Sequence, residues 1–372
     1  MTVVSSARVL AVNVGSSSLK LTLLDGDDQV IATRELDVRG DEIDEAGLGD
    51  ALRADLAGAD AVGHRIVHGG ERFVAPVLVD AEVDAALREL SDLAPLHQPK
   101  SLAALDAVSA QLPKVPAVAC FDTAFHASMP PAAATYALPA AWRERWPIRR
   151  YGFHGLSHGW VARRAPQMLG RPATGLRLVS CHLGAGASLC AIADGRSIDT
   201  TMGFTPLEGL VMATRSGSVD PGLLLWLLEH AGMAEGELAS ALERESGLKG
   251  LAGTADMRVV LTQAADGDAS SVLALEVWEH RLRALIAAMA AALGGLDALV
   301  FTGGIGQRSA PIRAHVVQGL GFLGLAIDSG RNETARGDVE LTADGAASRT
   351  LVLEAREDLE IARQTRAVLA RP

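Results

Sequence analysis

Cysteine is scarce in this chain. Its 372 residues include three cysteines, Cys120, Cys181 and Cys190, and no two of them form a C-x-x-C pair. An odd number of cysteines without paired spacing builds neither a disulfide framework nor a zinc site made of cysteine pairs. We therefore expect three buried thiols in a protein of the reducing cytoplasm.

Long apolar segments and blocks of positive charge are also missing. The longest weakly polar stretch, residues 284–296, is well short of the roughly 20 residues that a membrane helix needs. The N-terminal residues contain no basic segment followed by a long apolar one, so we expect no signal peptide. The formal net charge is −11, and no dense run of lysine or arginine occurs. These features argue against membranes and nucleic acids as partners.

Two common nucleotide-binding signatures give no support to a nucleotide site. No G-x-x-x-x-G-K-[S/T] motif occurs, which excludes a P-loop nucleotide hydrolase. Residues 319–324, GLGFLG, match G-x-G-x-x-G but follow an expected helix instead of a strand, so this match does not indicate a dinucleotide site. A nucleotide would have to bind through a different kind of turn.

What the sequence does contain is an alternation of short β-rich runs with helical patterns. Hydrophobic residues make up 49% and charged residues 21%, which is a globular composition, and 372 residues suit two domains. We therefore expect an α/β fold. The expected strands are residues 9–14, 19–25, 61–68, 117–122, 176–184, 188–194, 297–303 and 349–355. The expected helices are residues 82–91, 100–111, 155–169, 221–231, 236–244, 270–293, 311–319 and 357–370.

Two segments share a pattern of strand, small-residue turn and second strand. Residues 9–26 read VLAVNVGSSSLKLTLLDG, and residues 177–195 read RLVSCHLGAGASLCAIADG. The NVGSSSLK turn (13–20) has two interpretations. It is an ordinary hairpin turn, or a phosphate site in which small residues let backbone N–H groups face an anion. The likeness of the two segments predicts two copies of one α/β unit, each with a glycine-rich hairpin.

A third glycine cluster lies near the C-terminus. Residues 297–309, DALVFTGGIGQRS, predict an apolar strand, a GGIG turn and then a helix from Pro311. Backbone N–H groups at the start of a helix favour anions, so this turn suits a nucleotide. A tight strand-to-helix turn without any ligand would give the same pattern.

Several ionisable residues lie where an α/β fold places ligand contacts. Asp122 directly follows an apolar run, at the carboxyl end of a strand, where it either contacts a ligand or caps the next element. Arg65 lies inside a β-branched run and needs an anion, either a structural carboxylate or a substrate. Arg215 lies in a Ser- and Gly-rich turn, and its planar fork suits phosphate or carboxylate. His154 and His158 are four residues apart, but without an HExxH glutamate or a nearby cysteine we do not expect zinc.

The chain as a whole resembles the acetate kinase family. Ten motifs occur in the family's order: NVGSSSLK, GHRIVHGG, LAPLHQP, CFDTAFH, YGFHGLSH, HLGAGAS, TPLEGL, TRSGSVDP, GGIGQRS and EDLEIA. The resemblance runs from residue 8 to about residue 366. It implies an α/β fold of two duplicated ribonuclease-H-like (actin-like ATPase) domains with a nucleotide and substrate cleft between them. The implied N-terminal domain is residues 1–126 plus 358–372, closed by the C-terminal helix, and the implied nucleotide-binding domain is residues 127–357.

The resemblance also implies which residues carry out the reaction. Arg65 and Arg215 would clamp the carboxylate and the transferring phosphoryl group. Asp122 would be the essential acidic group near the acyl substrate, and His154 would stabilise the transition state. This set is chemically sufficient, because phosphoryl transfer needs positioning and charge neutralisation more than covalent help. A carboxylate substrate is already a nucleophile at neutral pH, so we expect Asp122 to position substrate or metal and not to act as a strong base.

Further residues are implied to hold the ligands. Mg²⁺, with Mn²⁺ as an alternative, would be organised by Asn13 and Glu357. The phosphates would be met by Ser16, Ser18 and Lys20. The nucleotide, ATP or ADP, would be held by His182, Leu183, Gly184, Ala185, Gly186, Asp256, Met257, Arg258, Gly303, Gly304, Ile305, Gly306 and Gln307. The acyl group would occupy a small apolar pocket next to Arg65, formed by Val67, Leu96, Phe153 and Pro206.

The sequence departs from the family's usual residues at several positions. Asparagine is usual at Ala185 and Gln98, glutamate and asparagine at Gln307 and Arg308, aspartate at Ser218 and threonine at Leu156. None of these positions is assigned to the transfer itself, so the expected reaction class stands. Nucleotide preference and acyl-chain length are left open by these changes.

The expected activity is therefore an Mg²⁺-dependent, reversible transfer of phosphate between ATP and acetate, giving ADP and acetyl phosphate. The expected partners are these small molecules and a second copy of the chain, in a cytoplasmic homodimer. One alternative is a relative that prefers propionate, because one methylene in a pocket is worth only about 1–3 kcal/mol. Another is a non-catalytic, actin-like nucleotide-binding protein, which would have no need of an acyl-phosphate site.

Overall fold

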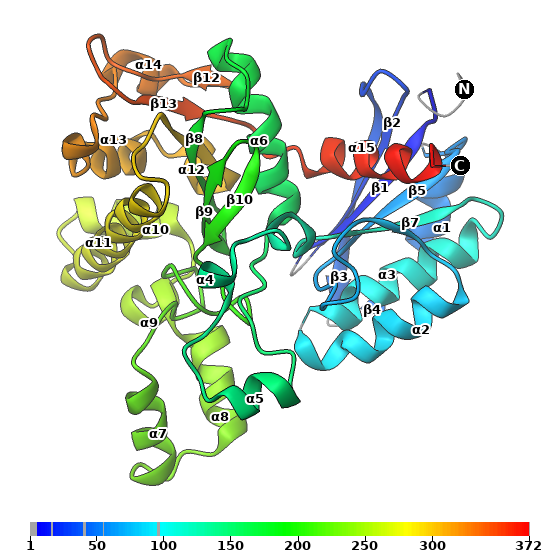
Figure 1. The fold of residues 1–372 in the computed structure, drawn as a ribbon, viewed down its shortest axis with the longest axis horizontal. Coiled ribbons are helices and arrows are strands. Elements are labelled where there is room, and N and C mark those ends of the chain that lie inside the picture. Colours follow the sequence, from blue (N-terminus) through cyan, green and yellow to red (C-terminus); the bar gives the residue numbers. More distant parts are fainter. Residues whose placement is uncertain (1–5, 16–17, 40–41, 55, 95–96, 372) are drawn as a thin grey trace. The chain divides into compact units, whose positions relative to one another are not determined.

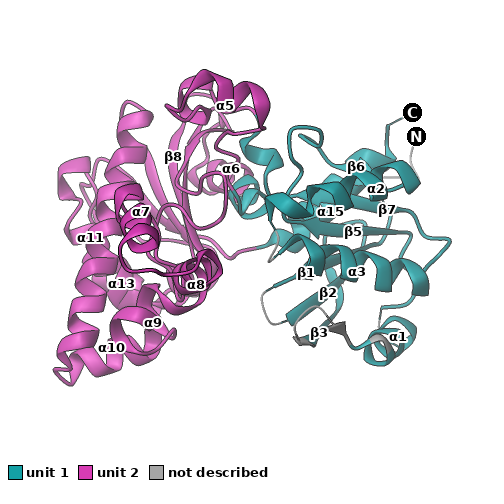
Figure 2. Ribbon diagram, turned by 90° about the horizontal axis from the view of Figure 1, so that it is seen from below, with its two compact units in different colours: residues 1–127, 153–160, 356–372 teal, residues 128–152, 161–355 magenta. Residues whose placement is uncertain are grey.

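The computed structural model describes residues 6–15, 18–39, 42–54, 56–94 and 97–371. The chain divides into two compact units, which Figure 2 colours separately. The first unit comprises residues 1–127, 153–160 and 356–372, and the second comprises residues 128–152 and 161–355. Residues 153–160, which the sequence prediction placed in the second domain, thus belong to the first compact unit. Helix α6 (Gly155–Leu169) begins in the first unit and continues in the second.

The first unit contains a mixed sheet in the order β4-β3-β2-β1-β5-β7-β6. Its strands are β1 (Val9–Val14), β2 (Ser18–Leu24), β3 (Val30–Arg39), β4 (Glu42–Ile43), β5 (Ala61–Ile66), β6 (Val77–Leu78) and β7 (Ala117–Phe121). β1, β2 and β3 are antiparallel neighbours, and β5 and then β7 follow on the other side of β1 in parallel. The carboxyl ends of β1, β5 and β7 therefore meet at one edge of the sheet.

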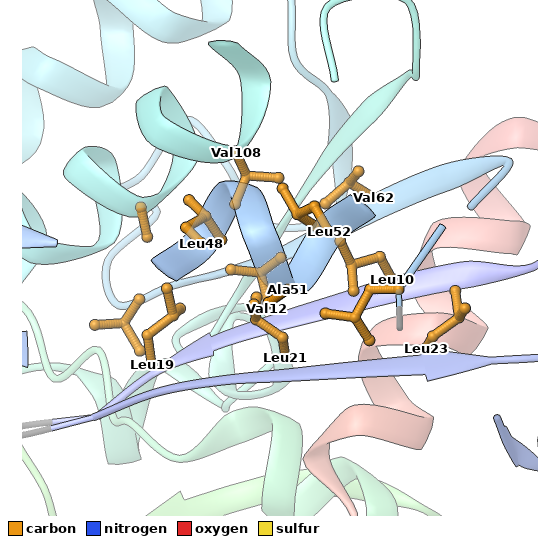
Figure 3. Packing of buried hydrophobic residues seen from close by; sticks show 13 residues of the cluster. Leu10, Val12, Leu19, Leu21, Leu23, Leu48, Ala51, Leu52, Val62 and Val108 are labelled. Atoms are coloured by element: carbon orange, nitrogen blue, oxygen red, sulfur yellow. The ribbon is translucent and has the colours of Figure 1, made fainter. Parts of the chain in front are cut away.

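Helices cover both faces of this sheet because its strands carry apolar side chains on both sides. Its helices are α1 (Glu45–Ala54), α2 (Ala81–Glu89), α3 (Gln98–Gln111), the start of α6 and α15 (Glu357–Leu369). Figure 3 shows Leu10 and Val12 of β1 in one cluster with Leu48 of α1 and Val108 of α3. The alternate β1 side chains belong to a second cluster, which contains Ile361 of α15. Alternation along β1 therefore places α1 and α3 on one face and α15 on the other (Figure 1).

Helix α15 packs very closely on β5. A Cβ atom at Gly63 would lie 2.3 Å from Thr365 Oγ1 and 2.5 Å from Ile361 Cγ2. Only glycine allows this approach, and the first residue of α15, Glu357, reaches Asn13 near the carboxyl end of β1.

The second unit repeats the topology of the first. Its sheet has the order β10-β9-β8-β11-β13-β12, with three antiparallel neighbours followed by two strands parallel to β8. Its strands are β8 (Arg177–Leu183), β9 (Ala187–Ala193), β10 (Arg196–Thr200), β11 (Ala298–Thr302), β12 (Val339–Glu340) and β13 (Arg349–Val352). The hairpins β1–β2 and β8–β9 thus occupy equivalent places in their sheets. The duplication predicted from residues 9–26 and 177–195 is confirmed.

The remaining helices belong to the second unit, and α11 lies against β8, β9 and β10. They are α4 (Pro131–Ala134), α5 (Ala140–Arg145), α7 (Pro221–Glu229), α8 (Glu235–Ser240), α9 (Gly247–Ala252), α10 (Met257–Ala265), α11 (Ala269–Ala292), α12 (Gly303–Arg308), α13 (Ala310–Gln318) and α14 (Ser329–Thr334). The helix expected over 236–244 is instead α8 followed by a π-helical turn at Ala241–Glu245. Within the described residues, no helix combines the length and apolar character needed to cross a bilayer.

Candidate active site

Asn13 lies at the carboxyl end of β1, just before the first glycine-rich hairpin turn. The Gly15 N–H donates to the Ser18 carbonyl at 2.7 Å, so β1 and β2 form the predicted hairpin. Lys20 lies opposite Asn13 in the register of this hairpin and is exposed. Ser16, which was assigned to the phosphates, is outside the described residues.

Arg65, near the carboxyl end of β5, joins three strands of the first unit. Its Nη1 donates to Asn13 Oδ1 at 3.1 Å and to the Val14 carbonyl at 2.9 Å. Its Nε and Nη2 donate to Asp122 Oδ2 at 3.0 Å and 2.7 Å. The anion that the sequence required for Arg65 is thus the carboxylate of Asp122.

The charges of neighbouring carboxylates also affect the pKa of Arg65. Burial lowers the pKa of Arg65, but the charges of Asp122 and Glu357 outweigh that effect and raise the pKa overall. The guanidinium is therefore a permanent cation in a largely buried place, and it orients its acidic partners.

Asp122 directly follows β7 and is almost fully buried. Its Oδ2 atom accepts both hydrogen bonds from Arg65, whereas its Oδ1 atom is buried with no hydrogen-bond partner among the described residues. Burial raises the pKa of this carboxyl, and the charge and hydrogen bonds of Arg65, together with the nearby backbone N–H of Leu156, oppose the rise. A buried carboxylate oxygen without a donor is unfavourable unless a ligand supplies one, so Oδ1 is suited to contact a substrate or a cation.

Glu357 completes this cluster from the opposite end of the chain. It is the first residue of α15, and its Oε2 atom accepts a hydrogen bond from Asn13 Nδ2 at 2.7 Å. The two residues assigned to Mg²⁺ are thus in direct contact, although 344 positions separate them. Among the described residues, no group of three or more His, Cys, Asp or Glu side chains could hold a metal by itself.

His154 has an unusual backbone conformation beside Asp122. Its φ is 55°, in the left-handed region that non-glycine residues rarely adopt. The next N–H, from Gly155, donates to the Asp122 carbonyl at 2.9 Å, and a Cβ on Gly155 would lie 2.1 Å from that oxygen. Such strain persists where the surroundings enforce it and is common at functional sites. Because His154 precedes α6, it does not share a helix face with His158.

Two of the residues assigned to the acyl pocket are buried in the first unit. Val67 follows β5, and Phe153 precedes His154. The Phe153 carbonyl lies 3.0 Å from His126 Nε2. The Phe153 ring makes an edge contact with the ring of His68, with the ring centroids 5.6 Å apart. Leu96, a third member of the predicted pocket, is outside the described residues.

Arg215 and Pro206 lie together in the second unit. Arg215 Nη1 donates to the Pro206 carbonyl at 3.2 Å and approaches Met212 Sδ at 3.8 Å. Burial raises the pKa of Glu243, and the charge of Arg215 opposes that rise, which places the two residues within electrostatic range. The Pro206 carbonyl thus helps to position the guanidinium of Arg215.

The second hairpin turn and the GGIG segment are in contact in the second unit. In the 182–186 segment, the Gly184 N–H donates to the Gly186 carbonyl at 3.0 Å. Gly303 has a φ of 75°, and a Cβ there would lie 2.7 Å from the Leu183 carbonyl oxygen. The helix predicted from Pro311 is confirmed as α13 (Ala310–Gln318), but the prediction that GGIG is a turn was wrong, because residues 303–308 form the helix α12. The positive φ of Gly303 lets that helix start directly after β11.

Asp256, Met257 and Arg258 form the start of α10, where Arg258 is exposed and Met257 is buried. The Asp256 carboxylate accepts the Arg258 N–H at 2.9 Å and the Arg258 guanidinium at 2.6 Å. These hydrogen bonds lower the pKa of Asp256 to about 2. The helix start is thus capped, and Arg258 is held against its own cap.

Sequence reasoning missed a buried arginine behind the GGIG segment. Arg313 of α13 is almost fully buried, and its Nη1 donates to the carbonyls of Gly306 and Gln307 at 2.9 Å and 2.7 Å. Its Nε and Nη2 donate to Asn332 Oδ1 and to the Asn332 carbonyl. Burial lowers the pKa of Arg313 to about 10. The reasoning applied to Arg65, that an arginine in an apolar run needs acceptors, would have found it.

Comparisons with known proteins agree on one family. The family model described as the acetokinase family matches residues 41–363. An acetate kinase from Deinococcus deserti is 46% identical over 97% of this chain and 98% of its own length, and one from Leifsonia xyli is 46% identical over 96% and 98%. A solved acetate kinase from Porphyromonas gingivalis superposes with a TM-score of 0.88 at 35% identity, covering 98% of this chain and all of that one. A solved propionate kinase from Francisella tularensis superposes with a TM-score of 0.91 at 35% identity, covering 97% of this chain and 100% of that one.

Proposed function

The chain belongs to the acetokinase family, and we propose from this premise that it transfers a phosphoryl group reversibly between ATP and the carboxylate of acetate, giving ADP and acetyl phosphate. The observation that carries this proposal is the cluster around Arg65. A buried arginine, an asparagine and two carboxylates meet where β1, β5 and β7 end. In α/β folds this edge is where ligands bind.

The reaction requires one bond to form and one to break. A carboxylate oxygen of acetate attacks the γ-phosphorus of ATP, and the bond from that phosphorus to the bridging oxygen breaks as ADP leaves. Acetate is ionised at neutral pH, so no residue needs to remove a proton from it. Positive groups must instead offset the charge of the transferring phosphoryl group, and we assign this role to Arg65, Arg215 and His154.

Asn13 and Glu357 are assigned to magnesium on the chemistry of their donor atoms. Mg²⁺ prefers hard oxygen ligands and is usually held by one or two carboxylates together with substrate phosphates and water. Asn13 and Glu357 offer an amide and a carboxylate in contact, and Asp122 Oδ1 is a further buried oxygen to which no described residue donates. These residues fit a metal that arrives with the nucleotide. When bound, Mg²⁺ neutralises charge on the phosphates and orients them.

The second unit is assigned to the nucleotide. The 182–186 turn and α12 lie against each other, and both contain small residues that would allow close approach of a ligand. Asp256, Met257 and Arg258 are proposed to contribute from the start of α10. In the first unit, Ser18 and Lys20 are proposed to meet the phosphates from the first hairpin.

A hydroxylamine trap tests this function. The purified protein is incubated with ATP and Mg²⁺ and with acetate, propionate or butyrate, and hydroxylamine converts acyl phosphate to the hydroxamate, which is measured as its coloured ferric complex. A larger amount of hydroxamate from acetate than from propionate supports the proposal. Higher kcat/KM with propionate would make the chain a propionate kinase, and ATP hydrolysis without hydroxamate would contradict carboxylate transfer altogether.

We also propose that the protein is a cytoplasmic homodimer. Helix α7 exposes Leu223, Leu225 and Trp226, three large apolar side chains that a second copy could cover. The three cysteines are free thiols and buried, as suits a reducing compartment.

Light scattering tests the dimer. The wild-type protein should have twice the chain mass of 38.7 kDa, and the double variant Leu225→Glu, Trp226→Glu should have the single mass. Phe322→Glu is the control, because Phe322 is a still more exposed apolar residue that lies outside α7. A wild-type monomer, or a double variant that stays dimeric, would contradict this assignment.

A further inference from the structure

Glu208 is a partly buried carboxylate of the second unit with a donor on each of its oxygens. Its Oε2 atom accepts the Tyr136 O–H at 2.6 Å, and its Oε1 atom accepts Arg150 Nη2 at 2.7 Å. A Cβ on Gly203 would lie 1.8 Å from Glu208 Oε2 and 2.2 Å from Tyr136 Oη, so only glycine leaves room for this contact. Hydrogen bonds to an ionised acceptor are about twice as strong as neutral ones. Glu208 therefore holds both donor side chains firmly.

Tyr136 and Arg150 in turn bind the backbone segment that follows β10. Arg150 Nη1 donates to the carbonyls of Thr201 and Met202 at 3.2 Å and 3.1 Å. Tyr136 Oη accepts the Phe204 N–H at 2.9 Å. Glu208 lies at the far end of this segment and binds the same two side chains, so the segment is fixed at both ends.

The segment fixed in this way leads directly into the loop that contains Arg215. Gly209 follows Glu208, and its N–H donates to Ser218 Oγ at 3.0 Å, while the Ser218 N–H donates to the Gly209 carbonyl at 3.0 Å. These two bonds close the loop at its base. Pro206 lies two positions before Glu208, and its carbonyl accepts Arg215 Nη1 at 3.2 Å. Glu208 thus bears on Arg215 through the Pro206 carbonyl and through the base of the loop.

We propose that Glu208 is a positioning residue for phosphoryl transfer that acts through Arg215. The inference rests on the proposed function, in which Arg215 offsets the charge of the transferring group. A catalytic group must be held precisely, because a misplacement of about 1 Å can cost about 100-fold in rate. Glu208 supplies that precision by fixing the loop before the substrates bind, and it does so without contacting them.

Glu208→Gln tests the carboxylate at nearly constant size. The amide nitrogen is a donor, and it must face either Tyr136 or Arg150, which are donors themselves. We expect kcat for acetyl phosphate formation to fall by about tenfold, since one contact is lost and the loop shifts. Glu340→Gln is the matched control, because the Glu340 side chain is 36% exposed against 35% for Glu208 and also pairs with an arginine. It should keep the wild-type kcat.

A double-mutant cycle with Arg215→Ala separates positioning from a general loss of structure. Arg215→Ala alone should reduce kcat by at least about 100-fold. Adding Glu208→Gln to Arg215→Ala should lower kcat by no more than about twofold, because the group that Glu208 positions is gone. Tyr136→Phe removes a single donor to Glu208 and should repeat this pattern with a smaller loss in the wild-type background.

Losses of equal size in both backgrounds, for Glu208→Gln and for Tyr136→Phe, would overturn the inference, because Glu208 would then support the fold and not Arg215. A wild-type kcat in Glu208→Gln would overturn it as well. In either case the wild type still makes acyl phosphate, and the proposed function stands. A wild type that made none would refute the proposed function and the inference with it.

Discussion

The guanidinium of Arg65 makes two hydrogen bonds to one oxygen of Asp122, at 3.0 Å and 2.7 Å, while the other oxygen of that carboxylate is buried and has no hydrogen-bond partner in the described part of the chain. This one-sided pairing differs from a structural salt bridge, in which both oxygens are usually satisfied. It keeps Arg65 charged and oriented and leaves Asp122 Oδ1 for a ligand. The account of the active site depends on this relationship.

Arg65→Lys should reduce kcat by at least about 100-fold, because an arginine that stabilises a phosphoryl-transfer transition state is worth about 10³–10⁵ in rate. A lysine keeps the charge but lacks the fork that reaches Asn13, Val14 and Asp122 together. Steady-state kinetics with acetate measures the loss. Arg72→Lys, whose arginine forms an exposed pair with Glu82, is the control and should be unaffected. Near-normal turnover in folded Arg65→Lys would remove Arg65 from the transfer.

Arg313→Met should raise KM for ATP by at least about tenfold, which corresponds to 1.4 kcal/mol, without changing KM for acetate. The reason is that Arg313 binds the last carbonyls of α12 and so fixes the GGIG segment. Arg313→Lys should restore part of the affinity by keeping one donor. The exposed Arg281 of α11 provides the control variant Arg281→Met. Equal increases in both KM values would indicate a general loss of structure and not positioning of the nucleotide site.

Asn13→Ala and Lys20→Ala should differ in their effects. Asn13 contacts Glu357, so its loss should raise the Mg²⁺ concentration needed for half-maximal activity. Lys20 is exposed on β2, and its loss should raise KM for ATP with the metal requirement unchanged. Titrations of Mg²⁺ and of ATP on each variant measure the two effects. Identical profiles in both variants would refute this division of roles.

Acidification should destabilise the first unit through its buried histidines. Burial lowers the pKa of His64 to about 3, of His68 to about 4 and of His126 to about 4. The unfolded chain, with histidine pKa values near 6.5, therefore binds more protons than the folded chain between pH 6.5 and 4. The stabilisation is complete above pH 6.5 and is lost as the pH falls, by up to about 1.4 kcal/mol per pH unit for each histidine.

Urea unfolding at several pH values checks this slope. His64→Leu should reduce it by one histidine's share, whereas His280→Leu, at an exposed position on α11, should leave it unchanged. A free energy of unfolding that is flat between pH 6.5 and 5 would contradict the prediction.

Much of the fold followed from local sequence patterns. The β1–β2 and β8–β9 hairpins were predictable because apolar runs flank small-residue turns in both copies. β3 was not predicted, since residues 30–39 mix charged and apolar side chains, and Val30 and Ile31 are in fact exposed. α1 was not predicted because it contains two glycines, which disfavour helix. α12 was predicted as a turn because glycine-rich segments such as Gly-Gly-Ile-Gly usually form turns. The helix starts at Gly303, whose positive φ and close approach to the Leu183 carbonyl were not evident from the sequence.

The candidate site was less predictable because its contacts are distant in sequence. The sequence showed that Arg65 needs an anion. Which carboxylate it contacts was not predictable, because the contact with Asp122 depends on the parallel pairing of β5 with β7. The contact of Asn13 with Glu357 joins the two ends of the chain, and no local pattern encodes it. The hydrogen bonds of the Gln98 side chain with the His68 backbone join residues 30 positions apart, and no sequence pattern indicates them.

The most direct test of the central claim follows the oxygen atoms of the carboxylate. The protein is incubated with ATP, Mg²⁺ and acetate labelled with ¹⁸O at both oxygens, and the products are observed by ³¹P NMR. The account predicts a signal of acetyl phosphate shifted by an ¹⁸O atom in the bridge between carbon and phosphorus, together with ADP. Inorganic phosphate and ADP without that signal would show that the γ-phosphoryl group goes to water, and would contradict the account.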